Sequence, residues 1–239
     1  MNAVLPFVGR KKEIEQLTRL HAQGKHVLIV GPPGVGKSAL VAHLHDSLRF
    51  VLSERSATLG GICDGLEAEL GLGAEGLRLV QRKQRLFKAL PATGKTVVFD
   101  GVSWTTPKMS AFFSCLSERI PLWIGTRSEH PWDIGHFWPF LWKFARVELH
   151  PFHLADTRAL VEAAVERRVV PRDARSIVEW LHHRSAGNPL ILRELLDELS
   201  KGDYSLDHPQ QLRLLDLDRR IHEVFPVPTG LAVQTKPEP

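Results

Sequence analysis

The segment Gly31–Ser38, with the sequence GPPGVGKS, constrains the fold more than any other part of the chain. It matches the pattern GxxxxGK(S/T) and follows an apolar run, Val27–Val30, that is typical of a buried strand. Apolar residues then recur at helical spacing, at Ala39, Leu40, Leu44 and Leu48. A strand, a glycine-rich turn and a helix in this order present backbone N–H groups to a phosphate. The sequence therefore predicts an α/β nucleotide-binding fold.

The residue types in this segment suit nucleotide chemistry. Glycines let the backbone curl tightly around phosphate groups, and the partly positive helix N-terminus faces the same anion. We expect Lys37 to reach the terminal phosphates and Ser38 to ligate magnesium, so that ATP and Mg²⁺ are the predicted cofactors. The predicted phosphate-binding residues are Gly31, Pro32, Pro33, Gly34, Val35, Gly36, Lys37, Ser38 and Ala39.

A second magnesium ligand is predicted at Asp100. The apolar run Thr96–Phe99 is typical of a strand, and an acidic residue at the end of such a strand holds Mg²⁺ in many nucleoside triphosphatases. An aspartate in this position can also be a simple turn residue, but the phosphate motif upstream favours the magnesium role. The next residue is Gly101, where a water-activating glutamate usually stands, and a glycine cannot activate water.

Strand and helix patterns alternate along the first part of the chain. Alternation of this kind predicts a doubly wound parallel sheet of about five strands, a P-loop NTPase fold, with helices on both faces. Ligands bind at the carboxyl ends of such strands, where Gly31, Glu54, Asp100 and Arg127 fall. The strands are expected near residues 27–30, 50–53, 96–99, 121–125 and 146–149.

Three regions are predicted along the chain. Residues 1–150 form the α/β core, residues 151–202 form a small C-terminal helical lid, and residues 203–239 form an extended or disordered tail. Prolines and caps give the expected helix limits. A helix from about Leu77 to Leu90 is expected to stop at Pro91, and Asp156 is expected to cap the first lid helix.

Composition is consistent with a globular protein. The chain has 239 residues, of which 43% are hydrophobic and 24% charged, and its net charge of +4 is only mildly basic. Two cysteines cannot form a disulfide framework, and no apolar run is long enough for a membrane helix or a signal peptide. We therefore expect a cytoplasmic protein without a membrane partner.

Several short segments together resemble a known family. FVGRKKEIEQL, GPPGVGKS, VVFD, IGTR, LHPFHLADTRALV and AGNPLILREL occur in the order seen in the STAND and initiator-like branches of the AAA+ ATPases. The resemblance covers about residues 7 to 200. It implies that Val8, Gly9 and Arg10 border the adenine and that Arg127 is the sensor at the end of the fourth strand. It also implies that the turn ending in Pro189 brings a lid helix to the nucleotide.

The chain departs from this family in three places. Gly101 replaces the expected acid, and Glu54 is a candidate base in its stead, although the sequence favours a solvated turn acid paired with Arg55 over that role. The residues after Gly202 leave no room for the winged-helix and repeat domains of STAND proteins. An arginine finger is not assigned, and Lys143 and Arg146 are positional candidates only.

Two further features suggest partners. Basic residues crowd one predicted helix, which is either a track for a DNA backbone or a solvated face: Arg78, Arg82, Lys83, Arg85 and Lys88. Residues 130–144 are rich in tryptophan and phenylalanine, which fits burial in the core, a protein contact or stacking on bases. The histidines show no metal-ligand spacing.

Four functions remain open at this point. The first is an ATP-binding, Mg-dependent switch of AAA+/STAND type that hydrolyses ATP slowly and changes its lid position or self-association. The second is a DNA-associated ATPase that uses the basic helix. The third is a structural subunit that holds a nucleotide without turnover. The fourth, a small-molecule kinase, lacks any acceptor-substrate motif.

Overall fold

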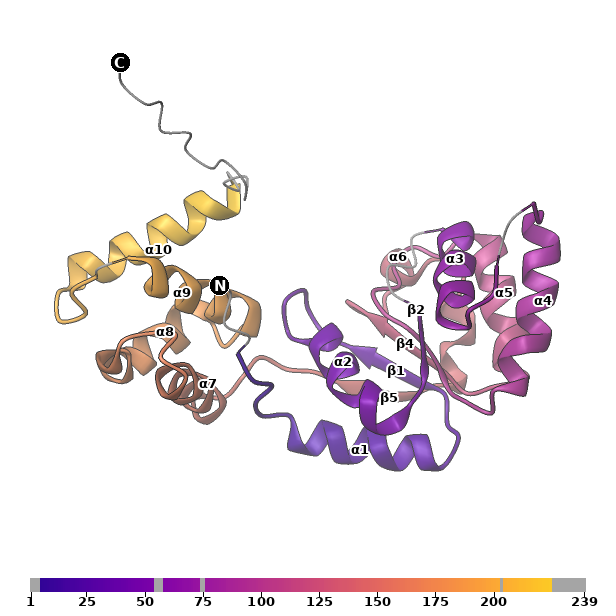
Figure 1. Ribbon diagram of the computed structural model, residues 1–239, viewed down its shortest axis with the longest axis horizontal. Helices are drawn as coiled ribbons and strands as arrows, with labels where there is room; N and C mark the ends of the chain where they lie inside the picture. Colours follow the sequence, from indigo (N-terminus) through magenta and orange to yellow (C-terminus); the bar gives the residue numbers. More distant parts are fainter. Residues whose placement is uncertain (1–4, 54–57, 74–75, 203, 225–239) are drawn as a thin grey trace, which may run out of the picture. The chain divides into compact units, whose positions relative to one another are not determined.

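The computed structural model describes residues 5–53, 58–73, 76–202 and 204–224. The chain divides into two compact units (Figure 1). One unit is Phe7–Phe152, and the other combines Met1–Pro6 with His153–Pro239. Among the described helices, none has both the length and the hydropathy that crossing a membrane requires.

The unit Phe7–Phe152 is built on a five-stranded sheet with the order β2-β3-β4-β1-β5. All neighbouring strands are parallel, which confirms the predicted doubly wound α/β fold. The inner strand β1 is buried along its whole length because its four apolar residues face helices on both sides. The strands are β1 Val27–Val30, β2 Val51–Ser53, β3 Val97–Phe99, β4 Leu122–Thr126 and β5 Ala145–Glu148.

Helices cover both faces of this sheet and create two apolar cores. On one face, α1 and α2 bury residues such as Leu17 and Leu40 against Val98 and Trp123. On the other face, α3, α4 and α5 pack a larger cluster that extends to Phe137 in the segment before β5. The helices of this unit are α1 Lys11–Ala22, α2 Lys37–Leu48, α3 Leu59–Glu69, α4 Leu79–Ala92, α5 Pro107–Ser117, α6 Pro131–Ile134 and the 3₁₀ helix η1 Trp138–Lys143.

Two helix limits differ from the sequence prediction. Pro91 does not stop α4 but lies inside its last turn, which ends at Ala92. Asp156 is not the N-cap of the first helix of the second unit, because His153 occupies that position. The Asp156 carboxylate instead accepts a hydrogen bond from the His153 backbone N–H at 3.2 Å, as the third residue of a capping box does.

The second unit is entirely helical in its described part. Its apolar core contains Leu160, Leu181, Leu192 and Leu195. The helices are α7 Leu154–Glu166, the 3₁₀ helix η2 Arg172–Ile177, α8 Val178–Ser185, α9 Pro189–Lys201 and α10 Pro209–Val224.

Helix α10 corrects the prediction of an extended or disordered tail from residue 203. Leu212 and Leu215 are buried, and Arg219 donates to Glu194 of α9 at 3.0 Å. The prolines that follow Phe225 favour a disordered tail, but the residues before them have the apolar spacing of an amphipathic helix. Residues 225–239 of the predicted tail lie outside the described residues.

Candidate functional site

The segment Gly31–Ser38 joins β1 to α2 by a turn that only glycine fits at several points. A Cβ atom at Gly31 would lie 2.7 Å from the Leu149 carbonyl oxygen and 2.8 Å from Val35 Cγ1. Gly34 and Gly36 have φ angles of 77° and 98°, in the left-handed region that other residues rarely adopt. Because of these glycines the backbone can form a tightly curled loop, which is the shape that binds a phosphate group.

Lys37 lies at the start of α2 with its side chain turned back onto this loop. Its ammonium group donates to the carbonyl oxygens of Gly31 at 2.6 Å and Pro32 at 3.0 Å. Burial lowers the pKa of Lys37, with an opposing effect from Asp100 and a further lowering by Arg127. These interactions place the Lys37 charge at the carboxyl edge of the sheet, between an acidic and a basic side chain.

Asp100 follows β3 directly, at the same sheet edge. Its Oδ1 atom is buried and has no hydrogen-bond partner among the described residues. A Cβ atom at Gly125 of β4 would lie 2.8 Å from that oxygen, so glycine there makes room for the carboxylate. A buried carboxylate oxygen without a donor is costly unless a cation or water satisfies it.

The magnesium prediction can be tested against these donors. Ser38 is exposed at the first turn of α2, and hydroxyl and carboxylate oxygens are the ligands that Mg²⁺ prefers. Ser38 and the unpartnered Asp100 oxygen therefore have the donor chemistry that a magnesium ion requires. Among the described residues, no group of three or more histidine, cysteine, aspartate or glutamate side chains could hold a metal.

Arg10 braces the phosphate loop. Its backbone has a φ of 62°, and its largely buried guanidinium donates to the Val35 carbonyl oxygen at 2.8 Å and to Glu13 at 3.0 Å. The same group lies over the Phe152 ring, 5.1 Å from its centroid. The predicted contact of Val8, Gly9 and Arg10 with adenine stays a prediction. The hydrogen bond to the loop was missed from sequence, because nothing in a linear pattern links residue 10 to residue 35.

Arg127 follows β4 at the same sheet edge as Asp100. It is 58% exposed, and its Nε atom lies 3.8 Å from Asp133, which also accepts a hydrogen bond from Ser128 at 2.5 Å. The loose ion pair leaves the guanidinium accessible to a ligand. The Arg127 charge also contributes to the lowered pKa of Lys37, so the two cations are close enough to repel each other.

Four predicted residues have no described interaction at this site. Glu54, the candidate base, lies outside the described residues. Pro189 begins α9 in the second unit, where the Asn188 side chain caps the helix, so its nucleotide contact stays a prediction. Of the two finger candidates, Arg146 pairs with Glu129, and the Lys143 ammonium lies over the Trp142 ring.

The basic helix is not a free track for DNA. Arg82 donates to Glu67 at 2.7 Å, and Arg85 donates to the other oxygen of the same carboxylate at 2.6 Å. Burial raises the pKa of Glu67, but the hydrogen bonds from both arginines outweigh this effect and the pKa is lowered. Arg82 and Arg85 thus anchor α4 to α3, while Arg78 and Lys88 are exposed and Lys83 is half-buried.

The aromatic segment is divided between core and surface. Phe137 and Phe144 are buried, whereas four tryptophans expose about half of their surface or more: Trp104, Trp132, Trp138 and Trp142. The Trp104 backbone N–H donates to the Asp133 carbonyl oxygen at 2.7 Å. Because Asp133 pairs with Arg127, which follows β4, part of this tryptophan group lies beside the carboxyl edge of the sheet.

Comparisons with known proteins agree with this geometry. Residues 6–66 match the family model described as AAA ATPase domain. No curated protein matches the sequence significantly. The Orc1 protein of Aeropyrum pernix, solved in complex with DNA, superposes with a TM-score of 0.67 at 16% identity, over 92% of this chain and 69% of that one.

Two further solved structures have the same fold. A Walker-type ATPase of Pyrococcus abyssi gives a TM-score of 0.64 at 13% identity, over 91% of this chain and 73% of that one. A STAND protein with a tetratricopeptide repeat sensor from Pyrococcus horikoshii gives 0.55 at 16% identity, over 90% of this chain. The match spans only 33% of that STAND protein.

The family match covers the braced phosphate loop, and the solved structures share the parallel sheet and the helices around it. The chain therefore has the fold of AAA+ P-loop ATPase core modules, and its residues 6–66 match the AAA ATPase domain model.

Proposed function

We propose that this chain binds ATP with Mg²⁺ and acts as a nucleotide-dependent switch with slow hydrolysis. The observation that carries the proposal is the pair formed by Lys37, held in the phosphate loop, and the unpartnered buried oxygen of Asp100. Lys37, Gly34, Gly36 and the N-terminus of α2 would bind the phosphates. When bound, Mg²⁺ would neutralise phosphate charge and polarise the terminal phosphoryl group.

Slow turnover is expected from the residues around Asp100. Gly101 carries no group that could accept a proton from water. Arg127 is accessible and can stabilise charge on a terminal phosphate, but it cannot act as a base at neutral pH. A water-activating residue must therefore come from Glu54 or from a partner.

The exposed tryptophans support a nucleotide-dependent contact with a second copy of the chain or with another protein. Tryptophan is favoured as an interface anchor, and Trp104 and Trp132 flank the segment whose Asp133 pairs with Arg127. A change at Arg127 on nucleotide binding would thus reach this surface through Asp133. Sedimentation velocity with and without ATP-Mg tests this part of the proposal.

The matched variants are Trp132→Ser and, as a control, Trp180→Ser in the other unit. Association that increases with ATP and is lost in Trp132→Ser but kept in Trp180→Ser supports the switch. An unchanged sedimentation coefficient in all nucleotide states would contradict the assembly part, while ATP binding itself is measured separately with Lys37→Ala.

Two alternative functions are compatible with the same nucleotide site. A structural subunit without turnover would be purified with nucleotide already bound and would release no phosphate when Mg²⁺ and ATP are added. A DNA-associated ATPase is supported by the solved neighbour in complex with DNA, but not by the α4 arginines, two of which are engaged within the chain. Steady-state phosphate release by the parent, Lys37→Ala and Glu54→Gln distinguishes ATP hydrolysis from nucleotide binding without hydrolysis.

A further inference from the structure

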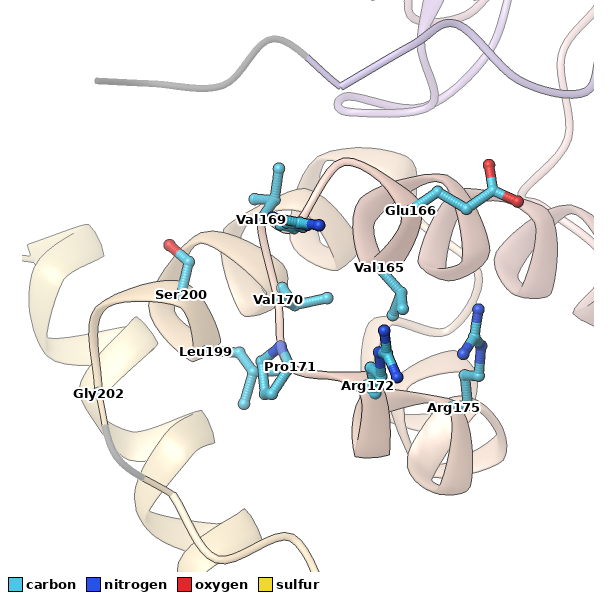
Figure 2. A pocket seen from close by; sticks show the side chains of 11 residues that line it. Val165, Glu166, Val169, Val170, Pro171, Arg172, Arg175, Leu199, Ser200 and Gly202 are labelled. Carbon is cyan, nitrogen blue, oxygen red and sulfur yellow. The ribbon is translucent and has the colours of Figure 1, made fainter.

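A groove of about 700 Å³ lies in the helical unit, and none of its lining residues is among those assigned to nucleotide binding. The ends of α7 and α9 form two of its walls, and the turn Arg168–Pro171 with η2 forms the rest. Figure 2 shows Arg172 and Arg175 of η2 and Val165 at the end of α7 among the side chains that line the groove. Arg168 also lines it, so three arginines belong to one groove.

The lining of this groove carries a net positive charge, since it contains three arginines and one carboxylate, that of the exposed Glu166. Arg175 pairs with Glu162 at 2.5 Å, but within the described residues no carboxylate lies at ion-pair distance from Arg168 or Arg172. Both of these arginines are exposed. The Arg168 backbone has a φ of 57°, in the left-handed region, so the turn sets the direction in which its Cα–Cβ bond leaves the chain. Two guanidinium groups are therefore available to an anion.

The lining also limits what kind of anion fits. Val165, Val170 and Leu199 line the groove but are at most 7% exposed, so the groove offers only half-buried Val169 and exposed Pro171 to an apolar anchor of a partner. Protein interfaces depend on such anchors, whereas a phosphodiester chain is bound chiefly through its charge. A guanidinium binds phosphate oxygens with two parallel hydrogen bonds. The groove is also open, as a polymer that passes through it requires.

We propose that this groove, named here the arginine groove, binds the phosphodiester backbone of a nucleic acid through Arg168 and Arg172, with Arg175 as a third cation. The cationic contact with nucleic acid would thus lie in the helical unit and not on α4, where Arg82 and Arg85 are engaged by Glu67. It does not depend on nucleotide binding at Lys37. Contacts with phosphates carry no base specificity, so sequence-independent binding follows.

The test is fluorescence anisotropy of the full chain with a labelled DNA duplex and its single strand, over a salt series. The groove variant is Arg168→Gln with Arg172→Gln. The matched control is Arg158→Gln with Arg193→Gln, which removes the same charge from exposed positions of the same unit outside the groove. Thermal unfolding and ATP binding of both variants verify that the chain is still folded.

The proposal predicts that the groove variant binds DNA at least about tenfold more weakly, since each arginine makes a charge-assisted bond. The slope of log affinity against log salt should fall by about one per arginine removed. The control should keep the parent slope and affinity within about twofold, allowing for a small long-range charge effect.

Three results would overturn the proposal. The first is equal weakening in the groove variant and the control, which would mean that only the net charge matters. The second is parent-like DNA binding by the groove variant. The third is arginine-dependent binding of a polyglutamate peptide that DNA does not displace, which would assign the arginine groove to an acidic protein segment instead.

Discussion

Replacement of Glu67 by glutamine tests whether the α4 arginines are structural. Glu67 is 2% exposed, and each of its carboxylate oxygens accepts a hydrogen bond from an arginine, Arg82 at 2.7 Å and Arg85 at 2.6 Å. A hydrogen bond to a charged group contributes about 1.5 to 3 kcal/mol. Glutamine keeps the volume and one acceptor oxygen, but it removes the charge and replaces the second acceptor by a donor that faces a cation.

The expected loss of unfolding free energy is about 2 to 3 kcal/mol. Breaking a fully buried pair costs about 3 to 5 kcal/mol, but Arg82 and Arg85 are 14% and 31% exposed and can recover some hydration. For a chain of this size the change corresponds to a fall in Tm of about 4 to 12 °C. Urea unfolding and thermal circular dichroism measure it. Glu118→Gln, an exposed position in the same unit, is the matched control.

The pH dependence provides an independent check. Because the folded pKa of Glu67 is lowered, its contribution to stability is present above its ordinary value of 4.5 and is lost as pH falls through the folded pKa. The parent and Glu67→Gln should therefore converge in stability at acidic pH. Equal stability of Glu67→Gln and Glu118→Gln at neutral pH would refute the reasoning and leave the α4 arginines available to a ligand.

Three other predictions concern the nucleotide site and the pH range of the fold. Arg10→Ala should weaken ATP binding about tenfold, because the phosphate loop loses the hydrogen bond from Arg10 to the Val35 carbonyl oxygen. Lys11→Ala, at an exposed position, should not weaken it. Equal ATP affinities of the two variants by calorimetry would contradict the bracing role of Arg10. Gly31→Ala should abolish ATP binding and destabilise the fold by about 1 to 3 kcal/mol, since its Cβ would lie 2.7 Å from the Leu149 carbonyl oxygen. Gly73→Ala, with open space around it, is the control and should change neither property. ATP binding retained by Gly31→Ala would contradict this prediction and show that the loop adjusts. Burial first, and then Lys143 and Lys25, lower the pKa of His26, whose Nδ1 accepts from the Leu122 N–H at 3.1 Å. The contribution of neutral His26 to stability should therefore be fully present above the ordinary pKa of 6.5 and be lost as pH falls through the folded pKa. His26→Asn should flatten the dependence of the unfolding free energy on pH in this range. An unchanged pH dependence would exclude His26 as its source.

Local patterns predicted the sheet and the phosphate loop well because their causes are local. The run Val27–Val30 is apolar throughout, and the glycine and lysine spacing of the next segment has few other uses. The sheet-edge position of Asp100 followed from the apolar run before it. Each of these features depends on residues that are neighbours in sequence.

The features that were missed depend on contacts between distant residues. Arg82 and Arg85 were interpreted as one charged face because their partner, Glu67, is on another helix. One signal was present: Glu67 falls on the apolar face of α3 with Ile62, Cys63 and Leu66. A glutamate on such a face needs a cation, so a buried ion pair could have been inferred.

The central claim is that Lys37 and Asp100 form a magnesium-dependent ATP site, and titration calorimetry of the apo chain tests it most directly. The account predicts one ATP site whose affinity falls strongly when Mg²⁺ is removed. Binding should be lost in Lys37→Ala, and Asp100→Asn should bind ATP with little dependence on Mg²⁺. Unchanged ATP affinity in Lys37→Ala, or the same Mg²⁺ dependence in Asp100→Asn as in the parent, would contradict it.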